Sequence, residues 1–456
     1  MDQKPIQIIR KKKIIVAGGG LAGLSAAHSL TSHGYNVTLI EKRPFLGGRT
    51  FSFKPGNYNV EIDNGQHIFL GCCDYYIQYL QSIGNVENTY IQKKLKIDVI
   101  RNGEKSTLSS TPFLGNLHML PAFIRYPHLG IIDKFLVIYG LIRCKFTKLT
   151  KISTSLDKES AYTWLKRNHQ SDKAIDNFWN LFILPALNND AKNVSADMVI
   201  MGFQESLLKQ SRNSAIGIPK IGLTALNGNP VKKFIEDNGG QVILGQSIKN
   251  FKIHNGKVSH VELSSGKRID ADAYLSAIPA KHLLKILPGK YANDKFFSRA
   301  SSLTTSPIVG IHIWYDRIIM PQDFVAILDS PIQWIFNKNV IQSNVNNTTQ
   351  HICISLSGAS QWIDTPKNDL KKLFTGEISR IFPKAKNAKI EKIIIVKEYE
   401  ATYQPVPGYK NHRLPTITPV KNFFLAGDWT DTGWPSTMEG AVRSGYTAAD
   451  VISQQI

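Results

Sequence analysis

The most regular pattern of apolar and polar positions lies in the first fifty residues. Residues 14–17 form a short, β-branched apolar run, which predicts a buried parallel strand. Residues 24–33 place their apolar side chains at helical spacing, and Gly34 follows where the end of a helix favours glycine. Residues 36–40 repeat the apolar, β-branched run. The pattern predicts a strand–helix–strand unit at the start of the chain.

Three later segments extend this unit. Residues 240–279 alternate apolar and polar positions between glycines, which predicts a β-meander that returns to a parallel strand. Residues 423–428 form an apolar run that ends in Gly-Asp, and residues 439–449 have helical spacing with small side chains. The pattern therefore predicts an α/β fold whose parallel sheet is assembled from separate parts of the chain.

The turn between the first strand and the first helix carries Gly18, Gly20 and Gly23. Gly18 permits a tight turn, Gly20 lets a pyrophosphate approach the backbone, and Gly23 lets the helix pack closely on the strand. The start of the helix offers free N–H groups and the positive end of its dipole to the phosphates. Glu41, at the end of the second strand, can accept hydrogen bonds from a ribose, and its charge disfavours the 2′-phosphate of NADP. The spacing predicts a dinucleotide site and leaves NAD and FAD open.

Lysine and arginine outnumber the acidic residues 55 to 35, which gives a formal net charge of +20. Such a charge attracts anionic lipid, phosphates or nucleic acid, but it also suits plain solubility. The four cysteines show no metal-ligand spacing, so we expect no metal. A basic start that leads into a strand does not read as a signal peptide, and no apolar run reaches the roughly 18–20 residues of a membrane span. These features predict a protein of the reducing cytoplasm.

Two further motifs distinguish between the cofactors. Leu46-Gly47-Gly48-Arg49 follows the second strand, and the run near the C-terminus ends in Gly427-Asp428. With the first glycine turn, these motifs resemble those of the flavin amine oxidase and phytoene desaturase superfamily. The resemblance implies a Rossmann-like FAD-binding domain of the glutathione-reductase type, joined to a discontinuous α+β substrate domain. Covalent members carry a cysteine shortly before the final Gly-Asp, whereas the last cysteine here is Cys353, so we expect non-covalent FAD.

The resemblance and the glycine turn together assign a set of cofactor-binding residues. These are Gly18, Gly20, Leu21, Ala22, Gly23, Glu41, Lys42, Gly47, Gly48, Arg49, Gly65, Gln66, His67, Ile248, Ala277, Gly427, Asp428, Pro435, Thr437, Met438, Glu439 and Ala441. In the superfamily, the helix that follows the last of these motifs points its N-terminus at the flavin ring, where its dipole stabilises negative charge on the reduced flavin.

A more specific resemblance lies in Asp63-Asn64-Gly65-Gln66-His67 and in the run 427–441, GDWTDTGWPSTMEGA. Both are similar to the hydroxysqualene dehydroxylases, and the similarity runs from about residue 13 to the end. It implies reductive removal of the hydroxyl group of hydroxysqualene, which yields squalene for hopanoid synthesis. Because no second dinucleotide motif is present, the electrons are expected from an external donor. Asn188-Asn189-Asp190 departs from the family pattern and leaves the shape of the substrate pocket open.

Five residues are candidates for contact with the substrate. Asp63 and His67 can protonate a leaving hydroxyl over the flavin, or they can form a turn and a satisfied buried donor. Glu439 is a third candidate catalytic residue, although an acid at a helix start also suits the helix dipole. Tyr403 and Trp434 are candidate substrate residues, because aromatic faces can stabilise an allylic cation or simply form the wall of a pocket.

Residues 117–146 combine many apolar side chains with interspersed lysine and arginine, and a helix is predicted over about 131–143. This composition suits an in-plane anchor on anionic lipid, and it equally suits a buried helix pair that lines a substrate channel. The prediction is a cytoplasmic protein that can lie on the inner face of the cytoplasmic membrane.

The sequence predicts two domains, each assembled from separate stretches of the chain. The FAD domain is expected from residues 1–95, 220–285 and 395–456, and the substrate domain from 96–219 and 286–394. The first rival is a carotenoid desaturase or isomerase, and the second is an amine oxidase. The third is a non-enzymatic lipid or nucleic-acid binder, which the net charge permits. The favoured prediction has a long isoprenoid substrate and no nucleic-acid partner.

Overall fold

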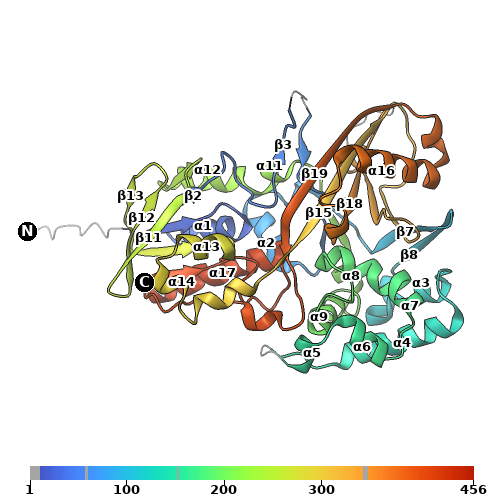
Figure 1. Ribbon diagram of the computed structural model, residues 1–456, viewed down its shortest axis with the longest axis horizontal. Coiled ribbons are helices and arrows are strands. Elements are labelled where there is room, and N and C mark those ends of the chain that lie inside the picture. The colour runs from blue at the N-terminus through green and yellow to red at the C-terminus, as the bar shows by residue number, and fades with distance from the viewer. Residues whose placement is uncertain (1–10, 57–59, 151–153, 343–347) are drawn as a thin grey trace, which may run out of the picture.

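Five parallel strands at one end of the molecule form the sheet that carries the glycine turns (Figure 1). The computed structural model describes residues 11–56, 60–150, 154–342 and 348–456. The strand order is β10-β2-β1-β14-β20, with the bounds β1 (Lys13–Ala17), β2 (Asn36–Glu41), β10 (Gln241–Leu244), β14 (Ala273–Ser276) and β20 (Phe423–Leu425). Because all the strands run in the same direction, the motifs that follow β1, β2, β14 and β20 meet at one edge of the sheet.

Alternate residues of β1 face opposite sides of the sheet. Ile14 and Val16 pack among helices α1 (Leu21–Ser32) and α17 (Met438–Gln455). Ile15 and Ala17 pack instead with an antiparallel sheet formed by β11 (Ile248–His254), β12 (Lys257–Leu263) and β13 (Arg268–Ile269). Burial on both faces explains why the strand reads as a continuous apolar run.

A seven-stranded mixed sheet lies at the other end of the molecule (Figure 1). Its order is β19-β15-β18-β17-β16-β7-β8, with the bounds β7 (Lys96–Arg101), β8 (Glu104–Ser109), β15 (Thr305–Tyr315), β16 (Phe324–Ile327), β17 (Trp334–Asn337), β18 (Gln350–Leu356) and β19 (Ile390–Tyr403). One face packs against α16 (Lys367–Ile381) through Leu370, Phe374 and Ile378. β15 and β19 are the longest strands and lead back toward the parallel sheet.

A cluster of helices packs on the opposite face of this sheet. The cluster includes α3 (Leu120–Arg125), α4 (Ile131–Phe146), α6 (Ala161–Arg167), α8 (Asn180–Leu187) and α9 (Ala196–Glu205). Its apolar core buries Trp164 and Trp179 and extends to Ile97 and Phe336 of the sheet. The space between this cluster and the parallel sheet holds the candidate site.

Shorter elements join the two ends. These are α2 (Asp74–Ser82), α11 (Leu223–Asn227), α12 (Asn229–Asp237), α13 (Ala280–Ile286), α15 (Lys338–Ile341), the pair β3 (Ser52–Phe53) and β4 (Ile62–Asp63), and the sheet of β5 (Phe69–Leu70), β6 (Thr89–Ile91) and β9 (Ile216–Pro219).

The α/β fold and the elements predicted at both ends of the chain are confirmed. The predicted strand 14–17 is β1, the predicted helix 24–33 is α1, and the helix predicted over 131–143 is α4. The division into two domains remains a prediction, and its boundary at 395 falls inside β19, which pairs with β15 along most of its length. Within the described residues, no helix is both long enough and apolar enough to cross a bilayer.

Candidate functional site

Two glycines of the turn after β1, Gly18 and Gly23, have no room for a side chain. Gly18 has a φ of +105°, and a Cβ there would lie 2.8 Å from the carbonyl oxygen of Ala277. A Cβ on Gly23 would lie only 1.9 Å from the carbonyl oxygen of Gly18. The turn is therefore closed against both α1 and the end of β14, and it leaves the start of α1 facing a cavity.

The second glycine pair packs directly on this turn. The N–H of Gly47 donates to the carbonyl oxygen of Gly19 over 2.8 Å, and a Cβ on Gly48 would lie 2.8 Å from the Cα of Gly20. Glu41 is buried, and its carboxylate accepts hydrogen bonds from the N–H groups of Gly19 (2.6 Å) and Arg43 (2.9 Å). The two glycine motifs are thus in direct backbone contact, and the carboxylate of Glu41 binds the first of them at Gly19.

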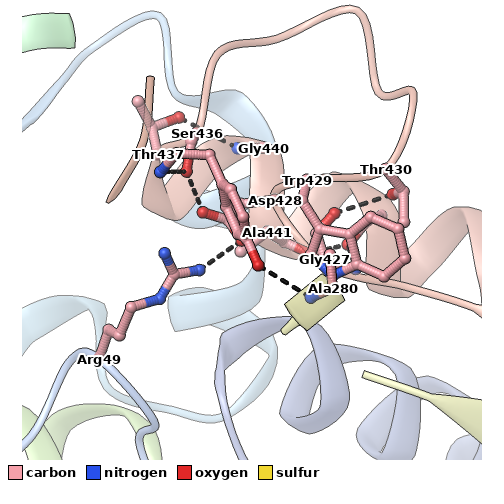
Figure 2. Close-up of polar contacts among 12 residues, drawn as sticks. Arg49, Ala280, Gly427, Asp428, Trp429, Thr430, Ser436, Thr437, Gly440 and Ala441 are labelled. Atoms are coloured by element: carbon pink, nitrogen blue, oxygen red, sulfur yellow. Dashed lines mark hydrogen bonds and ion pairs between the residues drawn. The ribbon is translucent and has the colours of Figure 1, made fainter. Parts of the chain in front are cut away.

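The segment after β20 completes the other side of the cavity (Figure 2). Asp428 forms an ion pair with Arg49 and accepts a hydrogen bond from Ser436. Ser436 in turn accepts a hydrogen bond from the N–H of Tyr403 at 3.0 Å. Thr437 begins α17 by accepting a hydrogen bond from the N–H of Gly440 at 3.2 Å. Through Arg49, these contacts connect the Gly47-Gly48-Arg49 motif to the segment that contains Gly427 and Asp428.

A cavity of about 510 Å³ lies between these segments. It is large enough for a cofactor of dinucleotide size. Most of the predicted cofactor residues line it, namely Gly18, Gly20, Leu21, Ala22, Glu41, Lys42, Gly47, Gly48, Arg49, His67, Ile248, Ala277, Gly427, Asp428, Thr437, Met438 and Ala441. No cysteine of the described chain is among the residues that line it.

A second, mostly apolar cavity of about 300 Å³ adjoins the first. Its walls come from the 64–70 segment, from α8 and α9, and from the seven-stranded sheet, and they include Phe182, Met198, Phe203 and Phe336. The two cavities share Arg49, His67, Glu398, Ala401, Thr402, Ser436, Thr437 and Met438. A flat ring system placed at this junction would face both an apolar chamber and the dinucleotide cavity.

The remaining predicted cofactor residues lie elsewhere around the junction. Gly65, Gln66, Pro435 and Glu439 line the apolar cavity and not the dinucleotide cavity, and Gly23 packs behind the turn. Their contact with a cofactor remains a prediction.

Asp63 and His67 differ in their access to the cavities. His67 lines both cavities, its Nδ1 lies 2.9 Å from the carbonyl oxygen of Gly65, and burial lowers the pKa of the ring. Asp63 lines neither cavity. Its carboxylate accepts hydrogen bonds from Ser52 Oγ (2.8 Å) and the N–H of Leu223 (3.1 Å), and it pairs with Lys338 at 3.3 Å.

Glu439 is buried at the start of α17, and its carboxylate contacts the start of α2. Its carboxylate accepts hydrogen bonds from the N–H groups of Tyr75 (3.3 Å) and Tyr76 (2.8 Å) at the first turn of α2, and from Arg443 Nε at 2.6 Å. Burial raises the pKa of Glu439 although these donors lower it. Arg443 also lies over the ring of Trp434, at 4.6 Å from the ring centre.

The two candidate aromatic residues face different cavities. Trp434 lines the apolar cavity. Tyr403 lines the dinucleotide cavity, and its hydroxyl accepts a hydrogen bond from the N–H of Ala280 at 2.8 Å. Burial raises the pKa of Tyr403, so its phenol is neutral at ordinary pH. A role for either ring in substrate binding stays a prediction.

Two functional candidates were missed by the sequence analysis. Glu398 of β19 is shared by both cavities, and Lys338 pairs with Asp63 from the far side of the 64–70 segment. A charged residue within a strand such as Glu398, or at the start of a short helix such as Lys338, usually faces solvent, so the sequence carries no signal for either. Among the described residues, no group of three or more His, Cys, Asp or Glu side chains is placed to hold a metal ion.

Comparison with known protein families agrees with this geometry. The family model for flavin containing amine oxidoreductases matches residues 21–453. The chain belongs to this family. It is a flavin-dependent oxidoreductase that binds FAD, and the cavity between its two terminal motifs fits that cofactor.

The chain is also similar in sequence to carotenoid desaturases and in structure to an amine oxidase. It is 25% identical to a 15-cis-phytoene desaturase from Synechococcus elongatus, over 97% of this chain and 96% of that protein. It is 24% identical to a zeta-carotene desaturase from Zea mays, over 95% of this chain and 82% of that protein. A putrescine oxidase structure with bound putrescine has a TM-score of 0.73 at 17% identity, over 97% of this chain and 99% of that one, which shows a shared fold.

Proposed function

We propose that this flavoprotein oxidises or reduces a long isoprenoid hydrocarbon held in the apolar cavity. The observation that carries the proposal is the direct junction between the FAD cavity and a chamber lined by Phe182, Met198, Phe203 and Phe336. An aliphatic polyene gains affinity from such walls because apolar surface leaves water.

Desaturation of a carotene-type polyene is the function that the relatives favour. Both desaturases described above align along nearly the whole chain. FAD supplies the two-electron chemistry, and the protein orients the polyene, excludes water and exchanges a proton. Anaerobic incubation of the FAD-loaded protein with phytoene and a quinone should yield a product with additional conjugated double bonds, seen as a red-shifted absorbance.

Reductive dehydroxylation of hydroxysqualene is the second candidate, and two segments support it. The Asp63–His67 segment and the run 427–441 are those that resemble hydroxysqualene dehydroxylases. The structure brings His67 and Trp434 from these segments to the wall of the apolar cavity. Chemically reduced protein and hydroxysqualene should then yield squalene with no added oxidant. Turnover of phytoene but not hydroxysqualene would reject this candidate, and the reverse result would reject desaturation.

We further propose that the protein takes its substrate from a membrane surface. Large apolar side chains are exposed together on the segment 113–146, including Phe113 (86% exposed), Ile132 (76%), Ile131 (75%) and Phe146 (75%). Exposed basic residues lie among them, namely Arg125, Arg143, Lys145 and Lys148. Apolar side chains that project beside positive charge suit a bilayer of anionic lipid. α4 packs against α9, which forms a wall of the apolar cavity.

Sedimentation with lipid vesicles tests this surface. The protein should bind vesicles that contain anionic lipid, and binding should weaken in high salt because the charges are screened. Replacing Ile131 and Phe135 by serine should reduce binding by about tenfold or more, since each buried methylene contributes about 0.8 kcal/mol. Ile417→Ser is the matched control, because Ile417 is 50% exposed on another surface. Equal loss in the control would reject the proposed surface.

A further inference from the structure

The junction between the two cavities is lined by few groups that can exchange a proton. Three titratable side chains of the described chain are shared by both cavities: Arg49, His67 and Glu398. Arg49 is committed to its ion pair with Asp428. His67 is held in a neutral form, because burial lowers its pKa. Glu398 is therefore the carboxyl group that faces both the cofactor and the apolar chamber.

The backbone of β19 fixes Glu398 at this place. Glu398 pairs in register with Ile308 of β15, and Ile308 also lines the apolar cavity. Two and three residues further along the same strand, Glu400 and Ala401 line the dinucleotide cavity. The strand thus crosses from one cavity to the other, and Glu398 lies at the crossing.

We propose that Glu398 is the catalytic residue that exchanges a proton with the isoprenoid substrate, an assignment that rests on the proposed function. In desaturation, its carboxylate would take a proton from the carbon next to the one that gives up hydride; the C–H electron pair would form the new double bond, and bound FAD would be the hydride acceptor. In dehydroxylation, its carboxylic acid would donate a proton to the leaving hydroxyl; the C–O bond would break, water would depart, and bound reduced FAD would be the source of the hydride for the new C–H bond.

The surroundings of Glu398 act on the pKa of its carboxyl group in both directions, and burial is the largest effect. Burial raises the pKa of Glu398, while a hydrogen bond with Asn64 and the charges of Arg43 and Arg49 act in the opposite direction. His67 lines the same junction, and Glu400, two residues further along the strand, forms an ion pair with Lys281 at 2.9 Å. A raised pKa brings the ionisation of this carboxyl group closer to neutral pH, which is the direction that general acid or base catalysis requires.

The direction of the pH dependence separates the two proposed reactions. Desaturation needs the carboxylate, so kcat should rise as the pH passes upward through the pKa of Glu398. Dehydroxylation needs the carboxylic acid, so kcat should fall over the same interval. Either profile should flatten in Glu398→Gln, which keeps a side chain of the same size and an amide able to bond Asn64.

The test compares Glu398→Gln with Glu391→Gln. Glu391 lies on the same strand, is exposed and lines neither cavity. We expect Glu398→Gln to lower kcat by about 100-fold or more with KM unchanged, the usual loss when a general acid or base is removed. FAD affinity should stay within about twofold of the wild type, and Glu391→Gln should match the wild type throughout. A Glu398→Gln protein with kcat within about threefold of the wild type would overturn the assignment.

A spectroscopic titration tests the position of Glu398 beside the flavin and needs no substrate. Ionisation of a carboxyl group beside the flavin should shift the visible flavin spectrum, with a midpoint above the ordinary pKa of glutamate near 4.3. The shift should be present in the wild type and in Glu391→Gln and absent in Glu398→Gln. If the wild type turns over neither substrate, the proposed function fails, while this shift still supports the place of Glu398. A shift that persists in Glu398→Gln would overturn it.

Discussion

Gly23 shows how strictly a single residue can be fixed by backbone contact. Its Cβ position is 1.9 Å from the carbonyl oxygen of Gly18 and 3.3 Å from the Cβ of Ala277, so a methyl group must displace the turn. We expect Gly23→Ala to lose FAD affinity by at least about tenfold and to lower the thermal midpoint, because the turn that faces the phosphates has to open. Flavin fluorescence titration and thermal unfolding measure the two effects.

Gly376 provides the matched control for this substitution. It lies within α16, has no left-handed φ, and has nothing within 4 Å of its Cβ position. Gly376→Ala should therefore raise stability by about 0.5–1 kcal/mol, since alanine is favoured over glycine in a helix interior. It should bind FAD as the wild type does. Comparable loss of FAD in both variants would contradict the explanation.

At this scale, the sequence predicted residues whose role depends on near neighbours in the chain. The glycines at 18, 20 and 23 are read from one short turn, and the structure shows close contacts that require glycine at 18 and 23. Glu398 and Lys338 could not be predicted, because their partners are distant in sequence. Lys338 lies 3.3 Å from Asp63 although 275 positions separate them in the sequence.

At the scale of secondary-structure elements, Glu439 links two helices. It stands in the first turn of α17, and its carboxylate receives the backbone N–H groups at the start of α2. We expect Glu439→Ala to lower stability by about 2 kcal/mol, because two N–H groups and Arg443 lose a charged acceptor. Glu439→Gln keeps an acceptor oxygen and should lose less. Urea unfolding of the FAD-loaded proteins measures both.

The same pair of variants tests the catalytic prediction for Glu439. A helix-start role requires that Glu439→Gln retain turnover within about threefold, because the amide still accepts hydrogen bonds. A proton-donor role requires loss of about 100-fold in Glu439→Gln with intact FAD binding. The contacts with α2 favour the first result.

Elements at the two ends of the chain were predicted because each shows a simple period. β1, α1, β2 and α17 lie where the apolar spacing placed them. The seven-stranded sheet was not predicted strand by strand, because its strands come from three separate stretches of the chain and include a parallel pair between β7 and β16. Such pairing is decided by tertiary packing and not by local pattern.

At the scale of the whole molecule, a buried ion pair links the β3–β4 pair to α15, which directly follows β17 of the seven-stranded sheet. Lys338 and Asp63 are each 3% exposed, and Lys338 also donates to Gln66 Oε1 at 3.1 Å. Lys338→Met should lower stability by about 3–5 kcal/mol, because Asp63 is left as an unpaired buried charge. Lys338→Met combined with Asp63→Asn should recover much of this loss. Urea unfolding of the single and double variants measures the coupling, and additive losses would contradict it.

FAD itself should hold the terminal segments of the chain together. The cavity is built from the turns after β1 and β2 and from the segment between β20 and α17, so the cofactor contacts regions that only the folded chain brings together. A ligand that binds only the folded state stabilises it by about 2.7 kcal/mol at a concentration 100 times its Kd. The thermal midpoint of the FAD-free protein should therefore rise with the logarithm of the FAD concentration.

A fragment of FAD such as ADP should show how much of the stabilisation comes from each end of the cavity. ADP lacks the ribityl and flavin parts of FAD, so we expect it to contact the glycine turn and the corner at Glu41 and not the junction near Thr437 and Met438. It should raise the thermal midpoint by less than FAD at equal saturation, because only the N-terminal motifs are engaged. Gly23→Ala should reduce the ADP effect along with the FAD effect at equal ligand concentration. An ADP effect as large as that of FAD would mean that the C-terminal segment adds no binding energy, and the joint site would have to be abandoned.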